Sequence, residues 1–318
     1  MSLLESAHAV ITATGDEPVD WSAVARAAKA ATDPGTLDLS PAEESAYAAD
    51  VRDARRNIRE VSGVAFSVPD TLEIQNRHHW IDANIETFER AFEPLADEPV
   101  VLPSVSRPLN TASVAGSLAF IARHVLGQYD PLLLADGDEE HGLYFVHPNV
   151  VHAADTLDVD FARFRRWIAF HEVTHAAEFG AAPWLPEYLS SRLHEAIGEL
   201  TERHLPRESF GELNLAMTAV EGYAELLMDE AFDDEYDDLR RKLDARRSGG
   251  DPISRVIRRL LGFQLKRQQY ERGRAFFEAV AAERGLAGAA IVWDDPAYLP
   301  SEAELEDPDR WLDRVPLA

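Results

Sequence analysis

The stretch FRRWIAFHEVTHAAEFG, which spans residues 164–180, constrains the fold of this chain more than any other segment. Phe164 and Ile168 are four residues apart, and His171 and His175 continue the same helical stripe at three- and four-residue steps. Apolar residues at this spacing indicate the core-facing side of an α-helix. Because side chains four residues apart on a helix are neighbours, the fold must accommodate two adjacent imidazoles on a face directed toward the core.

The ends of this helix and of the helices before it are marked by capping residues. We expect the helix to begin after Asp158 or Asp160, to run to about Phe179 and to stop at Gly180. Asp20 is placed to cap an earlier helix. Two further signals, the capping-box spacing of Ser40 and Glu43 and the amphipathic run 77–95, predict two more helices, and the proline-bearing run 96–110 predicts a linker.

Strand-like runs are few and short, and they lie at 63–68, 142–147 and 289–293. The pattern predicts a mainly α fold with a small β-sheet. We expect one domain over residues 1–318, with a helical N-terminal subdomain at about 18–100, a core at about 140–235, and C-terminal helices and a tail over 250–318. Two tryptophans in the turn-rich tail are expected to pin it to the body.

The charge balance is strongly acidic. The chain of 318 residues has 57 acidic and 31 basic residues, a formal net charge of −26, and three lysines among its basic residues. This composition is typical of proteins adapted to high salt. The chain has no cysteine, which excludes disulfides and thiolate ligands, so a metal ion would be held by His, Asp or Glu.

The composition also bears on location and partners. The N-terminus has no basic start, and no apolar run in the chain reaches the length of a membrane span. We therefore expect a cytoplasmic protein without a membrane partner. The acidic charge argues against nucleic-acid binding. One segment differs, because residues 240–274 carry 12 basic and 3 acidic residues. It either neutralises acidic patches of the fold or recognises an anion, and the first reading is preferred.

His171, Glu172 and His175 form a His-Glu-x-x-His pattern. On a helix the two imidazoles reach one zinc ion, and the glutamate beside them is placed to act as general base. The alternative is a pair of core histidines bonded to backbone or carboxylates, with Glu172 on a solvated face. The inward direction of the stripe favours the metal site.

A third ligand is expected from the run ELNLAMTAVEGYAELLMDEAF, where Glu221 falls inside an apolar helical stripe. A carboxylate on such a face needs a strong partner, which is either a zinc ion or an arginine. Gly222 beside it suits close packing of two helices around a metal, and Glu225 could accept the outer N–H of a ligand histidine. Glu178 is a weaker candidate, because three ligands on one straight helix do not converge on a tetrahedral ion.

Several other residues have open roles. The side chains that could donate a hydrogen bond to a reacting group are His147, His194, His204 and Tyr223. The run 142–147 could bind an extended substrate by strand addition, although a short apolar strand is more often plain core. The sequence specifies no oligomeric state.

The ordered motifs FRRWIAFHEVTHAAEF, PWL, EGYAELLMDE, RRLLGFQLKRQQYERGRAF and VWDDPAYLPSEAELEDPDRWLDRV resemble the zincin-like metallopeptidases of actinobacteria and archaea. That family is also labelled a hydrolase associated with biosynthesis of the deazaflavin coenzyme. The resemblance begins near VDWSAVARAA and reaches the C-terminus.

The resemblance implies a mostly helical zincin-like fold with zinc held, gluzincin-like, by His171, His175 and Glu221, and with Glu172 as catalytic base. Family members often have Asp where this chain has Glu225. The function expected is hydrolysis of an amide bond in a peptide or related substrate. A catalytically silent zincin fold used for binding or scaffolding is the alternative.

Overall fold

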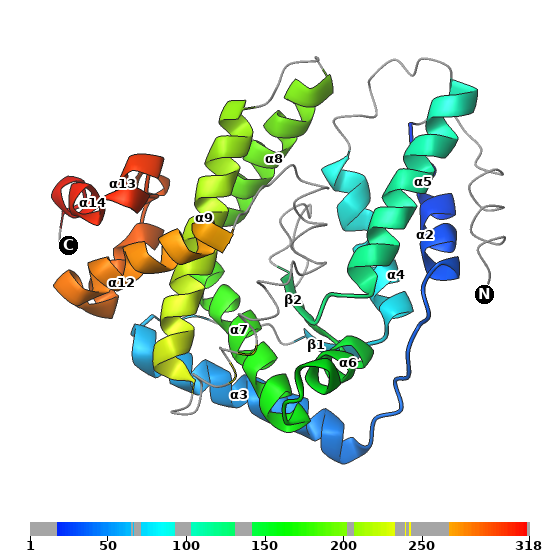
Figure 1. The fold of residues 1–318 in the computed structure, drawn as a ribbon, viewed down its shortest axis with the longest axis horizontal. Helices are drawn as coiled ribbons and strands as arrows, with labels where there is room; N and C mark the ends of the chain where they lie inside the picture. The colour runs from blue at the N-terminus through cyan, green and yellow to red at the C-terminus, as the bar shows by residue number, and fades with distance from the viewer. Residues whose placement is uncertain are drawn as a thin grey trace.

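Helix α7 (Phe161–Ala181) contacts α3, α6, α9 and strand β2, and it is the element around which the fold is arranged (Figure 1). The computed structural model describes residues 18–64, 66, 71–92, 103–130, 142–201, 207–232, 239, 242 and 267–316. Within these ranges the protein is mainly α-helical with one small sheet, which confirms the predicted fold class.

The other helices in the part of the chain that the structure describes are α2 (Trp21–Ala30), α3 (Pro41–Ser62), α4 (Arg77–Ala91), α5 (Pro103–Ala122), α6 (His147–Leu157), α8 (Leu185–Thr201), α9 (Arg207–Ala231), α12 (Arg267–Ala290), α13 (Glu302–Glu306) and α14 (Pro308–Arg314). The strands are β1 (Thr71–Gln75), β2 (Gly127–Asp130) and β3 (Gly142–Val146). Two short 3₁₀ turns, η2 (Ile291–Trp293) and η3 (Pro296–Tyr298), precede the last helices.

The capping residues read from the sequence do cap these helices. The Asp20 carboxylate accepts the Ala23 N–H, and Ser40 and Glu43 form both hydrogen bonds of a capping box. Asp160, rather than Asp158, caps α7 by accepting the Arg163 N–H. These contacts satisfy backbone donors that the first turn of a helix leaves unpaired.

The predicted end of α7 at Gly180 is wrong. The helix continues to Ala181 and ends just before Pro183, which cannot continue it. Gly180 has a different role, because a Cβ at this position would lie 2.9 Å from the Cβ of Phe66. The glycine therefore lets the segment that carries Phe66 approach the helix closely.

The predicted linker is also wrong over its second half. Residues 103–110 form the start of α5, with Pro108 inside the helix, while residues 93–102 lie outside the described part of the chain. The run 289–293 is not a strand but the end of α12 and the turn η2. Short apolar runs fit a buried helix end as well as a strand, and here the tertiary packing decides.

The sheet has the order β1-β3-β2. Strand β3 pairs parallel with β1 and antiparallel with β2, so both of its edges are used. This pairing excludes the possible addition of a substrate strand to residues 142–147, and the buried side chains of β3 show that the run is core, which was the alternative. Among the described residues strand β2 forms an edge of this sheet, and it packs beside α7.

Two hydrophobic clusters hold the elements together. The larger one surrounds α7 and includes side chains of α3, α9 and α12, and the smaller one lies among α2, α4 and α5. In Figure 1, α2 and α5 lie on one side of the sheet and α8 and α9 on the other. The two tail tryptophans, Trp293 and Trp311, are 1% and 0% exposed, so the tail is pinned to the body as expected.

Helices α9 and α12 cross at two glycines. A Cβ on Gly222 would lie 2.5 Å from the backbone of Gly273, and a Cβ on Gly273 would lie 2.4 Å from the carbonyl oxygen of Thr218. The close packing expected at Gly222 is present, but it faces α12 rather than α7. Because Gly222 follows Glu221 directly, α12 braces the turn of α9 from which that carboxylate projects.

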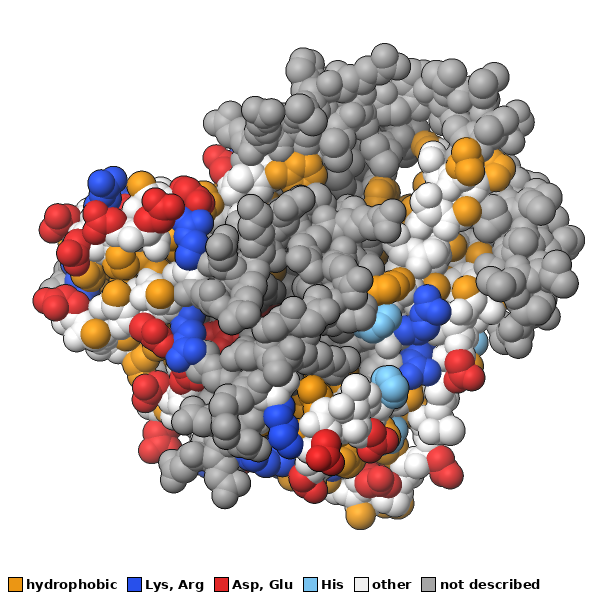
Figure 2. All heavy atoms as spheres, in the orientation of Figure 1, with side chains coloured by type: hydrophobic (Ala, Val, Ile, Leu, Met, Phe, Trp, Pro, Cys, Tyr) orange, Lys and Arg blue, Asp and Glu red, His pale blue; other side chains and the backbone are white. Residues whose placement is uncertain are grey.

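Acidic side chains gather over the C-terminal helices, at the left of Figure 2, where Glu302, Glu306, Asp307 and Asp309 are exposed. The basic segment 240–274 lies mostly outside the described residues, so neither reading of it is tested. None of the described helices is both long and apolar enough to cross a membrane.

Candidate metal centre

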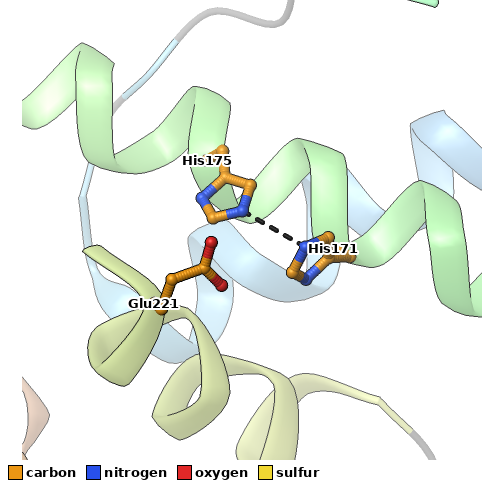
Figure 3. A group of neighbouring side chains, drawn as sticks. All are labelled: His171, His175 and Glu221. Carbon is orange, nitrogen blue, oxygen red and sulfur yellow. Dashed lines mark hydrogen bonds between the residues drawn. The ribbon is translucent and has the colours of Figure 1, made fainter. Parts of the chain in front are cut away.

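Two helices bring His171, His175 and Glu221 together. The imidazoles project from α7, and the carboxylate reaches them from α9, pointing between the two rings (Figure 3). One ligand atom from each residue lies within 4.8 Å of the others. The predicted third ligand is therefore brought to the predicted pair by packing of α7 against α9.

The geometry of these three side chains fits a zinc ion. The Nε2 atoms of His171 and His175 are 3.3 Å apart. Two nitrogens bound to one tetrahedral zinc at the usual bond length are also separated by about 3.3 Å. Two imidazoles and one carboxylate are a ligand set that catalytic zinc sites use, with a position left for water or substrate.

The second nitrogen of His175 is held by Glu178. Its Nδ1 lies 2.8 Å from Glu178 Oε2, and Glu178 is fully buried. A carboxylate in this position accepts a hydrogen bond from Nδ1–H, and in the neutral imidazole this leaves the Nε2 lone pair directed at a metal ion. Glu178 is thus not one of the clustered ligand atoms; it orients one of the ligands.

His171 is positioned by aromatic stacking. The ring of Trp167, one turn earlier on α7, lies 5.6 Å from the His171 ring at an angle of 11°. Trp167 in turn stacks on Phe164, and both are buried. The apolar stripe of the sequence therefore continues into the metal site as a row of stacked rings.

Glu172 points toward strand β2. Its Oε2 atom accepts the backbone N–H of Tyr129 at 2.8 Å, and the residue is 7% exposed. Burial raises the pKa of Glu172 to about 7, although the His175 charge and the Tyr129 hydrogen bond oppose that rise. A carboxyl group with a pKa near neutrality can both accept and return a proton at physiological pH.

Gly127 makes room for this glutamate. A Cβ at Gly127 would lie 2.8 Å from both Cγ and Oε1 of Glu172 and 2.9 Å from Cγ2 of Ile168. Any larger residue would therefore move Glu172 or the strand. Neither Gly127 nor the N–H of Tyr129 was predicted as part of the site, because a backbone donor leaves no residue-specific signal in the sequence.

The centre accumulates negative charge. Burial disfavours the charged form of His175, but the hydrogen bond and charge of Glu178, with Glu221 and Glu172, outweigh burial and raise its pKa. Burial likewise raises the pKa of Glu178, against the opposing effect of His175. Three carboxyl groups around two imidazoles are the surroundings in which a divalent cation is stabilised.

The remaining candidates lie elsewhere or stay untested. His147 forms a hydrogen bond with the hydroxyl of Tyr47 at 3.0 Å and lies edge-on against the ring of Phe161. Phe161 precedes His171 by ten residues, which is about 15 Å along α7. Glu225 lies half-buried one turn after Glu221, and its predicted role beside a ligand histidine remains a prediction.

Two histidines, His194 and His204, were also candidates to donate a hydrogen bond to a reacting group. His194 lies on α8, two residues after Arg192, and Arg192 pairs with Glu212 of α9. Glu212 precedes Glu221 by nine residues, which is about 14 Å along the helix. His194 is therefore separated from the metal centre. His204 lies outside the described residues.

Comparison with known proteins assigns the chain to a family. The sequence model of the family described as zincin-like metallopeptidase matches residues 19–206 and 197–312. A crystal structure from Chloroflexus aurantiacus, described as "a putative hydrolase with a novel fold", is similar over 93% of this chain and 98% of that one, with 31% identity and a TM-score of 0.79. No curated protein matches. With the HExxH helix, the glutamate of α9 and a family match across most of its length, the chain belongs to the zincin-like metallopeptidase family.

Proposed function

We propose that this protein is a zinc-dependent hydrolase that cleaves an amide bond, with a peptide as the expected substrate. The observation that carries the proposal is the 3.3 Å separation of the two Nε2 atoms, with Glu221 facing them and a buried Glu172 beside them. Membership of the family and similarity to a described hydrolase support the same reaction class.

His171, His175 and Glu221 would hold the zinc ion. Bound there, zinc would supply Lewis-acid polarisation of the substrate carbonyl and would make a water molecule more acidic. Trp167 and Glu178 keep the two imidazoles in position for that task.

Glu172 is the general base of this proposal. It takes a proton from the attacking water and passes it to the leaving amine as the amide bond breaks. The N–H of Tyr129 holds one carboxylate oxygen, which fixes the direction of the other. Because β2 lies beside α7 and β3 is already paired on both edges, an extended substrate is expected along β2 rather than β3.

Replacement of the base tests this proposal. The Glu172→Gln variant should keep its zinc and its fold, and it should lose hydrolysis of a peptide library by about 10²–10⁴-fold. Both proteins would be digested against the same library over a range of salt and zinc concentrations. Equal cleavage by the two proteins would remove Glu172 from the reaction, and no cleavage by either would favour a binding or scaffolding role.

A further inference from the structure

Several buried polar atoms have no hydrogen-bond partner among the residues that the structure describes, and three of them lie on side chains linked through Tyr223. These three are Oε1 of Glu178, the hydroxyl oxygen of Tyr223 and Nε1 of Trp293. Their side chains are between 0% and 1% exposed. Because about nine in ten buried polar groups in native proteins are hydrogen-bonded, three such atoms in one region call for a shared partner.

Tyr223 lies near each of the other two residues. The rings of Tyr223 and Trp293 meet edge-on at 5.5 Å, and the negative charge of Glu178 acts on Tyr223. Helices α7 and α9, which carry Glu178 and Tyr223, pack against each other. The unsatisfied atoms thus include one acceptor, the carboxylate oxygen, and two donors, the hydroxyl and the indole N–H.

The hydroxyl of Tyr223 can donate a hydrogen bond to an acceptor within the protein. The side chain is 1% exposed and therefore cannot touch a substrate. Its ring packs edge-on against the rings of Phe277 and Trp293.

We propose that Tyr223 is a positioning residue of the metal centre, whose hydroxyl binds Oε1 of Glu178 through a buried water and thereby holds the imidazole of His175. The inference deepens the proposed function and rests on the same metal site. A water in this place would have three protein partners if Trp293 also donates to it, which is within the usual range for buried water.

The physical consequence concerns the orientation of the ligand. A glutamate carboxylate turns easily about its last torsion when only one oxygen is held. Glu178 already binds Nδ1 of His175 with Oε2. With Oε1 held as well, the carboxylate is fixed, and the Nε2 atom of His175 is kept in the direction of the metal. Outer-shell contacts of this kind change metal affinity about 10–100-fold.

The first test uses the metal-free protein, so it does not depend on zinc binding or on activity. In histidine-labelled protein the Nδ1–H resonance of His175, assigned by its loss in His175→Gln, is expected to shift in Tyr223→Phe. The matched control is Tyr47→Phe, which removes an equally buried hydroxyl that binds His147 instead. An unchanged His175 resonance in Tyr223→Phe would overturn the proposal, even if zinc binding itself proved correct.

The second test measures zinc affinity by competition with a chelator. We expect Tyr223→Phe to weaken zinc about tenfold, Tyr47→Phe to leave it unchanged, and the double variant Tyr223→Phe/Glu178→Gln to match Glu178→Gln alone, because both changes interrupt one chain of contacts. Additive losses in the double variant would contradict the chain.

A crystal structure of the unmodified protein decides the question if Tyr223→Phe does not fold. Density for one bridging atom between the hydroxyl of Tyr223 and Oε1 of Glu178 is expected. Purely apolar contact between the two groups would overturn the inference.

Discussion

Helix α7 carries buried charge on two sides, and the two sides are balanced in different ways. Toward α3, Arg165 binds Asp50 at 2.7 Å and Arg166 binds Asp53 at 2.8 Å. Each arginine also lies over aromatic rings, at 4.6–5.5 Å from their centroids. On this side the chain supplies a partner of opposite charge for each group, and the result is a helix–helix contact.

Toward α9 and β2 the same helix presents Glu172, His175 and Glu178, and α9 adds Glu221. The strongest charge effects on Glu172 and Glu178 come from His175 and from Glu221. With His171, two imidazoles therefore stand among three carboxyl groups. The difference separates buried charges that serve packing from those that, under the proposed function, would serve a metal ion.

The largest expected effect is a loss of zinc affinity, and it distinguishes the ligand Glu221 from Glu225 on the same helix. Glu221→Ala should lose zinc by more than the roughly 10–100-fold that removal of an outer-shell contact causes. Glu225→Ala, one turn later on the same helix, is the matched control and should fall within that smaller range. Elemental analysis and chelator competition measure both. Full zinc occupancy in Glu221→Ala would remove this glutamate from the centre.

Zinc affinity should also depend steeply on pH. The raised pKa of His175 means that the metal-free imidazole is protonated through the neutral range, so zinc must displace a proton. Affinity is therefore expected to rise with pH, by about tenfold per unit for each proton released. Titration calorimetry in buffers of different ionisation enthalpy would count that proton. A constant affinity between pH 6 and pH 8 would contradict the assignment.

The other side of α7 should respond in stability rather than in zinc binding. Asp50→Asn leaves Arg165 buried without its countercharge and is expected to cost about 2–3 kcal/mol, below the full value for a completely buried pair. Asp82→Asn, at the exposed pair with Lys29, should cost less than about 1 kcal/mol. Denaturant unfolding measures both. A zinc affinity that fell in Asp50→Asn would show that the two sides are coupled.

The smallest expected effect per residue is the dependence of stability on salt, to which every surface charge contributes a little. At −26 the folded chain repels itself, and the screening length falls from about 30 Å at 0.01 M salt to about 3 Å at 1 M. The melting temperature is expected to rise from dilute buffer to molar potassium chloride. A flat or falling melting temperature would show that the acidic surface is balanced locally and is not an adaptation to salt.

Features governed by local geometry were predictable. The caps at Asp20, Ser40 and Asp160, and the shared face of His171 and His175, follow from hydrogen bonds and periodicity within one helix. Predictions that required a choice between local alternatives did less well. The linker over 103–110 is helical, and the run 289–293 is a helix end, because packing decides between conformations that the local sequence permits.

The sequence by itself determined the two histidines, the glutamate between them and the carboxylate on the apolar stripe of α9, because helical spacing fixes which side chains share a face. Only the tertiary structure decided what surrounds them. The N–H of Tyr129, the clearance at Gly127 and the contact of Gly222 with α12 join segments that are distant in the chain. A backbone donor or an absent side chain has no periodic pattern, so such contacts become visible only when the elements pack.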